Sequence, residues 1–233
     1  MVHNCSDIGC SMHNGKGCVS TVPIFNHLAQ DQMDEIQKLI VTKTFKKGET
    51  IYDANTQSNA LYVISRGRVR IDRITEDGKS QLIRLLNPGD FTGELSLFND
   101  SIHDSFASAM MNTSICMIKR EDLQNLLNTY PQISLKIMSE LSKRLSKSEE
   151  QSTRFATQKV ETRLAHYLVE SLESDQSPKI IHLGMSKKDL ASYLGTSPET
   201  ISRKLFDFEE AGYIKQISNQ EIELLDIDEL LMI

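Results

Sequence analysis

The chain lacks any apolar run that approaches the ~20 residues of a membrane-spanning helix. It begins MVHNCSDIGC, with neither a basic start nor an apolar core, so we expect no secretory signal. The G-x-S-x-G motif of hydrolases, the phosphate-binding loop and the H-E-x-x-H motif of zinc proteases are also missing. These absences favour a cytoplasmic protein that is neither an enzyme nor embedded in a membrane.

Cysteine is scarce and unevenly placed. Cys5, Cys10 and Cys18 lie in the first eighteen residues, and Cys116 stands alone in the body of the chain. Thiolates are soft metal ligands and redox-active groups, so this set can hold an iron–sulfur cluster or zinc, or form disulfides. Without an export signal, metal or redox chemistry in a reducing cytoplasm is favoured over a disulfide scaffold.

The middle of the chain has a residue pattern typical of β-structure. Between about residues 41 and 120, short runs of β-branched and aromatic residues alternate with polar ones. Glycine turn signals separate these runs at Gly48, Gly67, Gly78 and Gly89. The pattern predicts an antiparallel barrel or two-sheet roll. Ahead of it, helical spacing over residues 28–40 predicts a short helix.

Barrels also occur in cupin-like metalloenzymes, which need two or three histidines and a carboxylate inside the barrel. Of the six histidines in the chain, only His103 lies in the predicted roll. A cupin-like metalloenzyme is therefore kept only as an alternative from another functional class.

Residues 121 to about 157 return to helical spacing, with Pro131 in the first turn of a long helix. One stripe of this helix follows the alternating three- and four-residue spacing of a coiled-coil seam. Its members are Met138, Leu141, Leu145, Ser148, Ser152 and Phe155. The stripe can pack on the chain's own roll, but the other faces are so polar that we expect a homodimer. Serines in place of apolar residues make this seam marginal.

Residues 186–208 carry a helix-turn-helix pattern. Ser186 to Asp189 opens a short helix, Gly195 makes the turn, and Pro198 lies in the first turn of a second helix. Thr196 and Glu199 have the spacing of a capping box for that second helix. Such a pair of helices is typical of proteins that insert the second helix into the major groove of DNA.

The second helix is two-faced. At about 100° per residue, one face gathers Ile201, Leu205 and Phe208, and the opposite face gathers Glu199, Ser202, Arg203 and Phe206. Glu, Ser and Arg suit base edges in the major groove. Phe206 is unusual there, and a thymine methyl, a partner surface or partial burial would each account for it. The candidate DNA-binding residues are Glu199, Ser202, Arg203, Ser197, Thr200, Lys204 and Lys187.

A β-hairpin wing is predicted after these helices, with strands at residues 213–217 and 221–225 around a turn at 218–220. Residues 186–204 contain four basic and two acidic residues, whereas residues 207–229 contain eight acidic residues and one basic residue. The net charge of −6 gives no general affinity for nucleic acid, so binding should rest on the second helix and its neighbours.

A β-roll, a long helix and a winged helix-turn-helix, in this order, resemble the CRP/FNR superfamily of bacterial transcription regulators. The resemblance covers about residues 22–225, and its most specific marks are GDFTGELSLF at 89–98 and SPETISRKL at 197–205. It implies an α+β fold with a jelly-roll-like antiparallel β-roll of the cyclic-nucleotide-binding type. We expect a Cys-rich arm at 1–20, the β-roll at 21–120, a dimerisation helix at 121–158 and a DNA-binding winged helix-turn-helix at 159–233.

Within that superfamily, Glu199, Ser202 and Arg203 match the E-x-x-S-R pattern by which FNR-type members recognise TTGAT half-sites. The resemblance thus implies a homodimer on double-stranded DNA with a repeat like TTGAT-N4-ATCAA, and RNA polymerase as a further partner. FNR carries an acidic residue where this chain has Ser148. A neutral hydroxyl there implies control by reorientation within a standing dimer.

The resemblance also implies a 4Fe–4S cluster on Cys5, Cys10, Cys18 and Cys116, and hence sensing of oxygen or redox state. The arm spacing here is C-x4-C-x7-C, wider than the C-x2-C-x5-C of enterobacterial members. Three alternatives stay open. One is a thiol–disulfide switch between Cys5 or Cys10 and Cys116. Another is zinc, with His3 or His13 as additional ligands. The third is that the thiols are structurally idle.

A cyclic nucleotide is not expected. The Gly93-Glu94-Leu95 turn that holds the ribose in nucleotide-binding members is present. The stretch that should bring an Arg-Ser pair to the cyclic phosphate instead contains His103, Asp104 and Ser105. A carboxylate facing a phosphate is repelled.

Overall fold

The structure is a computed structural model, which describes residues 3–4, 22–76, 78, 80–94, 102–172 and 178–233. Three of the predicted sensor cysteines, Cys5, Cys10 and Cys18, lie outside the described residues. The chain divides into two compact units, Met1–Arg144 and Leu145–Ile233, which we call the N-terminal and the C-terminal unit.

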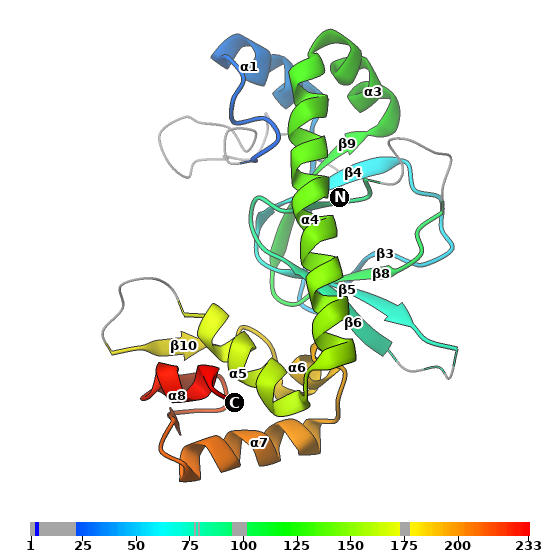
Figure 1. Cartoon of the computed structure of the whole chain (residues 1–233). Helices are drawn as coiled ribbons and strands as arrows, with labels where there is room; N and C mark the ends of the chain where they lie inside the picture. Colours follow the sequence, from blue (N-terminus) through cyan, green and yellow to red (C-terminus); the bar gives the residue numbers. More distant parts are fainter. Residues whose placement is uncertain (1–2, 5–21, 77, 79, 95–101, 173–177) are drawn as a thin grey trace. The chain divides into compact units, whose positions relative to one another are not determined.

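The N-terminal unit contains two antiparallel sheets (Figure 1). One has the strand order β1-β2-β9-β4-β7 and the other has the order β3-β8-β5-β6. The strands are β1 (His3–Asn4), β2 (Val41–Phe45), β3 (Thr50–Tyr52), β4 (Ala60–Arg66), β5 (Val69–Ile74), β6 (Ser80–Leu86), β7 (Phe91–Thr92), β8 (Phe106–Ala109) and β9 (Thr113–Lys119). The predicted two-sheet roll is therefore confirmed. The sequence pattern did not predict β1.

Turns fall where glycine predicted them. Gly48, Gly67, Gly78 and Gly89 all have positive φ angles, between 77° and 93°. The turn at Gly93 is the most constrained, because a Cβ atom there would lie 2.4 Å from the carbonyl oxygen of Ala60. With a φ of 85°, Gly93 is required by close backbone packing, whatever the roll binds.

Among the residues that the structure describes, the roll is accompanied by the helices α1 (Gln30–Leu39), α3 (Arg120–Thr129) and α4 (Pro131–Thr157). The predicted helical region is interrupted at Tyr130, which has φ −126° and ψ 76°. A residue that precedes proline is disfavoured in the α-region, so α3 ends there and Pro131 opens α4. The predicted place of Pro131 is confirmed.

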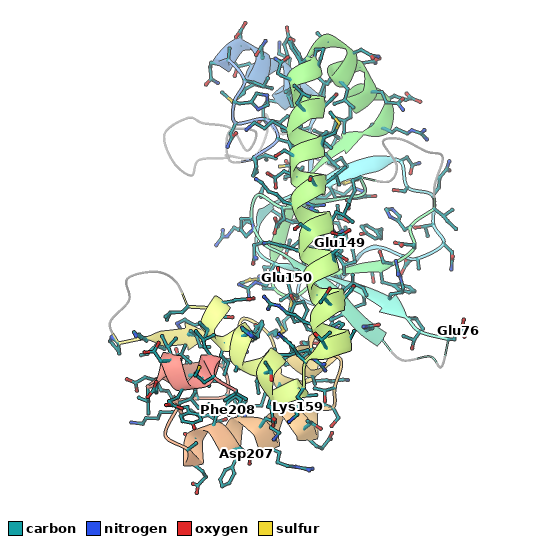
Figure 2. All side chains as sticks on the ribbon, viewed as in Figure 1. Glu76, Glu149, Glu150, Lys159, Asp207 and Phe208 are labelled. Atoms are coloured by element: carbon teal, nitrogen blue, oxygen red, sulfur yellow. The ribbon has the colours of Figure 1, made fainter. Side chains whose placement is uncertain are left out.

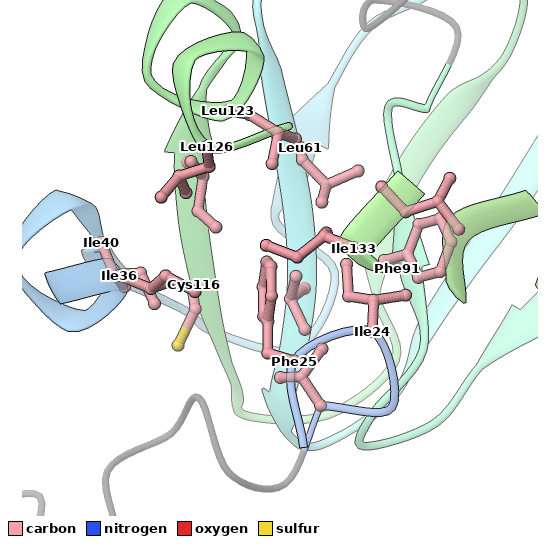
Figure 3. Close-up of a cluster of buried hydrophobic side chains, with 14 of the residues drawn as sticks. Ile24, Phe25, Ile36, Ile40, Leu61, Phe91, Cys116, Leu123, Leu126 and Ile133 are labelled. Carbon is pink, nitrogen blue, oxygen red and sulfur yellow. The ribbon is translucent and has the colours of Figure 1, made fainter. Parts of the chain in front are cut away.

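The principal core of the N-terminal unit lies between these helices and the sheet that contains β4 and β9 (Figure 3). Ile133 and Ile137 of α4 are 0% and 1% exposed, and burial of each such side chain contributes roughly 1.5–3 kcal/mol. The cluster consists of Val22, Ile24, Phe25, Leu28, Ile36, Ile40, Leu61, Val63, Phe91, Cys116, Ile118, Leu123, Leu126, Ile133 and Ile137. The segment that follows the N-terminal arm thus shares one core with Cys116.

The C-terminal unit combines helices with a small antiparallel sheet of order β10-β12-β11. Its elements after α4 are α5 (Val160–Glu170), β10 (Ile180–His182), α6 (Lys187–Tyr193), α7 (Pro198–Glu210), β11 (Ile214–Gln216), β12 (Glu221–Leu224) and α8 (Ile227–Leu231). The predicted hairpin wing is confirmed by the pairing of β11 with β12. Strand β10 and helix α8 were not predicted. Across the described part of the chain, every helix is too short or too polar to cross a bilayer.

Candidate nucleic-acid interface and redox site

Helices α6 and α7 form the predicted helix-turn-helix. The hydroxyl of Ser186 caps α6 by accepting a hydrogen bond of 3.1 Å from the backbone amide of Asp189. Gly195 makes the turn with a φ of 66°. Both features agree with the sequence pattern.

The cap of α7 is one residue later than predicted. Ser197, not Thr196, is the N-cap, and its hydroxyl accepts a 3.2 Å hydrogen bond from the amide of Thr200. Pro198 explains the shift. Its fixed φ and missing N–H suit the first helical position, so the residue directly before it becomes the cap. The amide of Thr196 instead donates to the carbonyl of Ala191 at 2.8 Å.

The two faces of α7 are as predicted. Its apolar face is buried, with exposures of 0% for Ile201, 0% for Leu205 and 4% for Phe208, which is labelled in Figure 2. The opposite face is exposed and comprises Glu199, Ser202, Arg203 and Phe206. We call Glu199, Ser202 and Arg203 the recognition face.

The surroundings of Glu199 favour the ionised form of its carboxyl group. A hydrogen bond to its own backbone amide, and then one from the hydroxyl of Ser197, lower the pKa of its carboxyl group. It lies in the first turn of α7, where the positive end of the helix dipole also favours a carboxylate. The recognition face therefore offers an acceptor beside the guanidinium donors of Arg203, and base edges in the major groove call for both kinds of group.

Lys204, another predicted DNA contact, is engaged within the unit. Its ammonium lies 2.7 Å from a carboxylate oxygen of Glu161 on α5 and 3.3 Å from one of Asp207. These two partners raise the pKa of Lys204. The pair with Glu161 holds α7 to α5, so Lys204 positions the recognition helix.

The remaining predicted contacts also have structural partners. Lys187 donates a 3.0 Å hydrogen bond from Nζ to Oε1 of Gln216 in β11. Gln216 is held in turn by Glu209 of α7, whose carboxylate accepts from the backbone amide and the side chain of Gln216 at 2.7 and 2.9 Å. Ser197 and Thr200 are occupied in the cap. Local sequence did not reveal these ties, because most join separate elements.

The predicted dimer seam on α4 is partly exposed. Met138 and Leu145 are 54% and 61% exposed, and Ser148 and Ser152 are exposed polar positions. Leu135, which the seam pattern did not include, is 66% exposed. Large apolar side chains on a long helix that are left open to solvent are candidates for contact with another chain.

The other two seam residues pack within the chain. Leu141 is half-buried against the principal core of the N-terminal unit. Phe155 lies below the guanidinium of Arg163, whose Cζ atom is 5.1 Å from the centre of the ring. Arg163 also donates to the carbonyl oxygens of Gln158 and Leu194 at 2.9 and 3.0 Å. Phe155 therefore belongs at least partly to the packing of the C-terminal unit.

In the roll, the signature carboxylate of Glu94 is already bound. One of its oxygens lies 3.3 Å from a guanidinium nitrogen of Arg84 and 3.2 Å from one of Arg144. Arg144 also donates to the carbonyl of Phe91 at 2.9 Å and lies 3.9 Å from the centre of that ring. Burial lowers the pKa of Arg144, while Glu94 opposes the shift. The turn thereby fastens α4 to β7.

The stretch expected to repel a cyclic phosphate is arranged around His103. Its imidazole stacks on Tyr52 with ring centres 3.7 Å apart, and burial lowers its pKa. Asp104 forms an ion pair with Arg73. Glu94 and His103 help to line a cavity of about 40 Å³, far below the roughly 300–1,000 Å³ of pockets that enclose a drug-sized ligand.

Cys116 lies in β9, inside the first sheet, and is 1% exposed. Its strand neighbours are Val63 in β4 and Thr42 in β2. Thr42 in turn pairs with His3 of β1, so the start of the arm is two strands away from Cys116. The sulfur of Cys116 takes part in a disulfide bond. Among the described residues, no three or more His, Cys, Asp or Glu side chains gather as a metal site.

Comparison with known proteins matches two parts of the chain. Residues 42–130 match the model of the cyclic nucleotide-binding domain, and residues 162–233 match the Crp-like helix-turn-helix domain. The chain is 29% identical to a probable transcriptional regulator, flp, of Lacticaseibacillus casei, over 91% of this chain and 96% of that protein. It is also 29% identical to the fumarate and nitrate reduction regulatory protein of Vibrio cholerae, over 96% and 90% of the two chains.

Solved structures agree on the architecture. FixK2 from Bradyrhizobium japonicum superimposes with a TM-score of 0.71 at 25% identity, over 82% of this chain and 95% of that one. A CooA mutant from Carboxydothermus hydrogenoformans has a TM-score of 0.74 at 24% identity, over 84% and 88%, which supports the fold alone. With the roll, the long helix and a capped recognition helix in this order, the chain belongs to the CRP/FNR family of transcription regulators, which bind DNA through the helix-turn-helix and are not enzymes.

Proposed function

We propose that the protein is a homodimeric, redox-responsive regulator of the FNR branch that binds TTGAT-N4-ATCAA-like repeats and acts on RNA polymerase. The DNA site is supported by the recognition face, where Glu199, Ser202 and Arg203 are exposed together at the spacing of the E-x-x-S-R pattern. Relatives named for fumarate and nitrate reduction, alignable over nearly the whole chain, support the branch.

The observation that carries the redox proposal is the position of Cys116 relative to both ends of the arm. Residues 5–21, which contain the other three cysteines, lie between β1 and the segment that starts at Val22. β1 is two strands away from Cys116 in the same sheet, and Val22 is in the same buried cluster as Cys116. Because both ends of the arm are held near one thiol, the arm has only a short distance to span to reach it. The entropic cost of closing such a loop also grows only slowly with its length.

The donor set suits an iron–sulfur cluster. Once the disulfide at Cys116 is reduced, Cys5, Cys10, Cys18 and Cys116 would supply four thiolates, the number that a 4Fe–4S cluster takes. When bound, such a cluster supplies a centre that responds to oxygen and to electron supply. The apolar residues around Cys116 keep water from this side of the site, and hydrogen bonding and solvent exposure set the potential of such centres. Zinc on the same thiolates remains the minor alternative.

Homodimer formation is supported by the open stripe on α4. Leu135, Met138 and Leu145 expose apolar surface on one helix, although Ile133 and Ile137 of the same helix are buried in the core. Because Ser148 carries no charge, the stripe is free of the like-charge repulsion that an acidic seam residue would cause. We therefore assign control to reorientation of the two C-terminal units within a standing dimer.

The cluster is tested by purification without air. Protein isolated in this way should be brown and contain iron and acid-labile sulfide, and Cys116→Ser should remove the colour. Met117→Leu is the matched control, because it alters the next position of β9 without touching a thiol. The cluster proposal fails if the Cys116→Ser protein retains as much iron and sulfide as the control.

Sensing is tested separately from metal content. Replacing all four cysteines with serine should make occupancy of a TTGAT repeat identical with and without air, whereas the parent protein should differ. If the parent already shows equal occupancy under both conditions, the redox proposal is wrong even when the protein binds the repeat selectively.

A thiol–disulfide switch is the second candidate, and the disulfide at Cys116 favours it. In this case two thiolates lose two electrons to an oxidant of the cytoplasmic thiol pool and form one sulfur–sulfur bond, and reduction restores both thiols. The protein would then be colourless in both states, and DNA affinity would follow dithiothreitol treatment. Alkylation followed by mass measurement would count two extra modified cysteines after reduction.

A further inference from the structure

Phe206 is the one large apolar side chain of α7, which the structure describes in full, that does not join the core. It is 58% exposed, whereas Ile201, Leu205 and Phe208 are at most 4% exposed. Isolated apolar residues on a surface are common. Phe206 differs because its exposed ring lies on the side of α7 that carries the recognition face.

The geometry of an α-helix centres Phe206 on that face. At about 100° per residue, it lies roughly 20° from the direction of Glu199 and between the directions of Ser202 and Arg203. At about 1.5 Å per residue, it lies one turn further along the axis than Ser202. A duplex that contacts Ser202 and Arg203 would therefore meet the ring of Phe206 next.

The polar side chains next to Phe206 at this end of α7 are paired within the unit or acidic. Lys204 and Asp207 are paired with each other, and Lys204 also with Glu161. Glu209 holds Gln216. Glu210 is an exposed carboxylate, which the phosphates repel.

We propose that Phe206 contacts the 5-methyl group of a thymine in the major groove, and so adds a methyl-specific contact to the polar recognition by Glu199, Ser202 and Arg203. The C5-methyl of thymine is the apolar group that the major groove presents, and phenylalanine is among the side chains that contact it. The inference rests on the proposed use of the recognition face and deepens it, because it predicts a preference for T over other pyrimidines at one position of each half-site.

The test uses DNA in which single thymines of a TTGAT-N4-ATCAA duplex and its flanks are replaced by deoxyuridine, in both half-sites at once. This exchange removes only the methyl group and keeps every hydrogen-bonding group. For the unmodified full-length protein, replacement of thymine at one position should lower the affinity for DNA about fourfold per half-site. This factor corresponds to the free energy of burying one methyl-sized group. Phe206→Ala should lose the same factor on thymine DNA and show no further loss on deoxyuridine DNA at that position.

Two further variants complete the test. Phe206→Leu retains an apolar side chain and should keep part of the sensitivity to the methyl group. Leu225→Ala is the matched control, since Leu225 is 54% exposed on the same unit but lies outside α7; its deoxyuridine profile should equal that of the parent. Circular dichroism and thermal melting check that each variant is folded.

Three results would overturn the proposal. The parent protein shows no thymine whose methyl matters, or Phe206→Ala remains sensitive to the same methyl, or Phe206→Ala binds every duplex normally yet loses transcription with purified RNA polymerase. The last result would assign Phe206 to a protein contact. Arg203→Ala separates this inference from the proposed function, because it should abolish selectivity for the repeat itself.

Discussion

The two units differ in how far apart in the sequence their functional groups lie. In the C-terminal unit, the cap at Ser197 and the recognition face from Glu199 to Arg203 fall within one continuous segment on one helix. In the N-terminal unit, Cys116 in β9 meets the segment from Val22 only through the folded core. The helix that carries the proposed DNA contacts can therefore be predicted from a short local pattern, whereas the proposed redox site depends on long-range packing.

The largest effect that sharpens this comparison is expected from Arg203→Ala. Loss of a guanidinium contact to a base costs about 1–3 kcal/mol, so a dimer with two half-sites should lose about 2–6 kcal/mol of binding free energy. Fluorescence anisotropy with repeat and scrambled duplexes measures it. Lys204→Ala, next along the helix, should cost much less affinity because its ammonium is held by Glu161 and Asp207. Equal losses in both variants would contradict the assignment of the recognition face.

In the N-terminal unit, Gly93→Ala should lower the free energy of unfolding by about 3 kcal/mol or more. The new Cβ atom meets the carbonyl of Ala60 at 2.4 Å and the backbone stays at positive φ. Gly48→Ala has a similar φ of 86° but open space around the Cβ atom, so it should cost only the backbone strain, about 1–2 kcal/mol. Urea unfolding followed by far-ultraviolet circular dichroism compares them. Identical midpoints would show that the turn at Gly93 tolerates the contact.

Leu145→Lys should weaken the homodimer by about 2 kcal/mol. It places one positive charge from each copy at the proposed seam and removes apolar surface that is 61% exposed in the single chain. Analytical ultracentrifugation over a range of concentrations gives the dissociation constant. Lys147→Ala, on another face of α4, serves as the control. A dimer that is unchanged by Leu145→Lys would show that the two copies meet elsewhere.

Removing either helix cap should cost about 1 kcal/mol of stability, with different consequences for DNA. Ser197→Ala loses the cap of α7 and should also weaken selective binding, because the first turn of α7 carries Glu199. Ser186→Ala loses the cap of α6 and should leave selectivity intact. Thermal melting and anisotropy together test the pair, and the distinction fails if both variants bind the repeat with the same affinity.

The smallest effect concerns pH and His103. Burial lowers the pKa of this imidazole below its ordinary value of 6.5, so the unfolded chain binds more protons than the folded one just below pH 6.5. Stability should be complete above that pH and fall as the pH drops through the window. His103→Phe keeps a ring beside Tyr52 but cannot titrate, so melting temperatures should depend less steeply on pH between 5 and 7. An unchanged slope would show that His103 does not contribute to the pH dependence of stability.

Several features of the C-terminal unit could be predicted because they are set by neighbours in sequence. The buried face with Ile201 and Leu205 follows from helical spacing, and the turn at Gly195 follows from the need for a positive φ. The cap was misassigned to Thr196 because capping-box spacing was given more weight than Pro198, which favours Ser197 as the cap.

Partners that come from distant segments could not be predicted. The tie of Lys204 to Glu161 joins α7 to α5, and the tie of Arg144 to Glu94 joins α4 to the roll. Both are ion pairs whose members have no fixed spacing in sequence. Strand β1 is similar, since its two residues show no alternation and pair only because β2 provides an open edge. The roll itself could be predicted because its turns recur regularly.

The pairing of Glu94 with two guanidinium groups has a consequence for how such chains are classified. A survey of genomes keyed to a Gly-Glu-Leu signature would count this chain among receptors for a second messenger, and the match to a cyclic nucleotide-binding domain would reinforce that label. The carboxylate, however, is already neutralised by Arg84 and Arg144. The Gly-Glu-Leu signature alone does not reveal this internal pairing, which depends on Arg84 and Arg144 from distant segments of the chain.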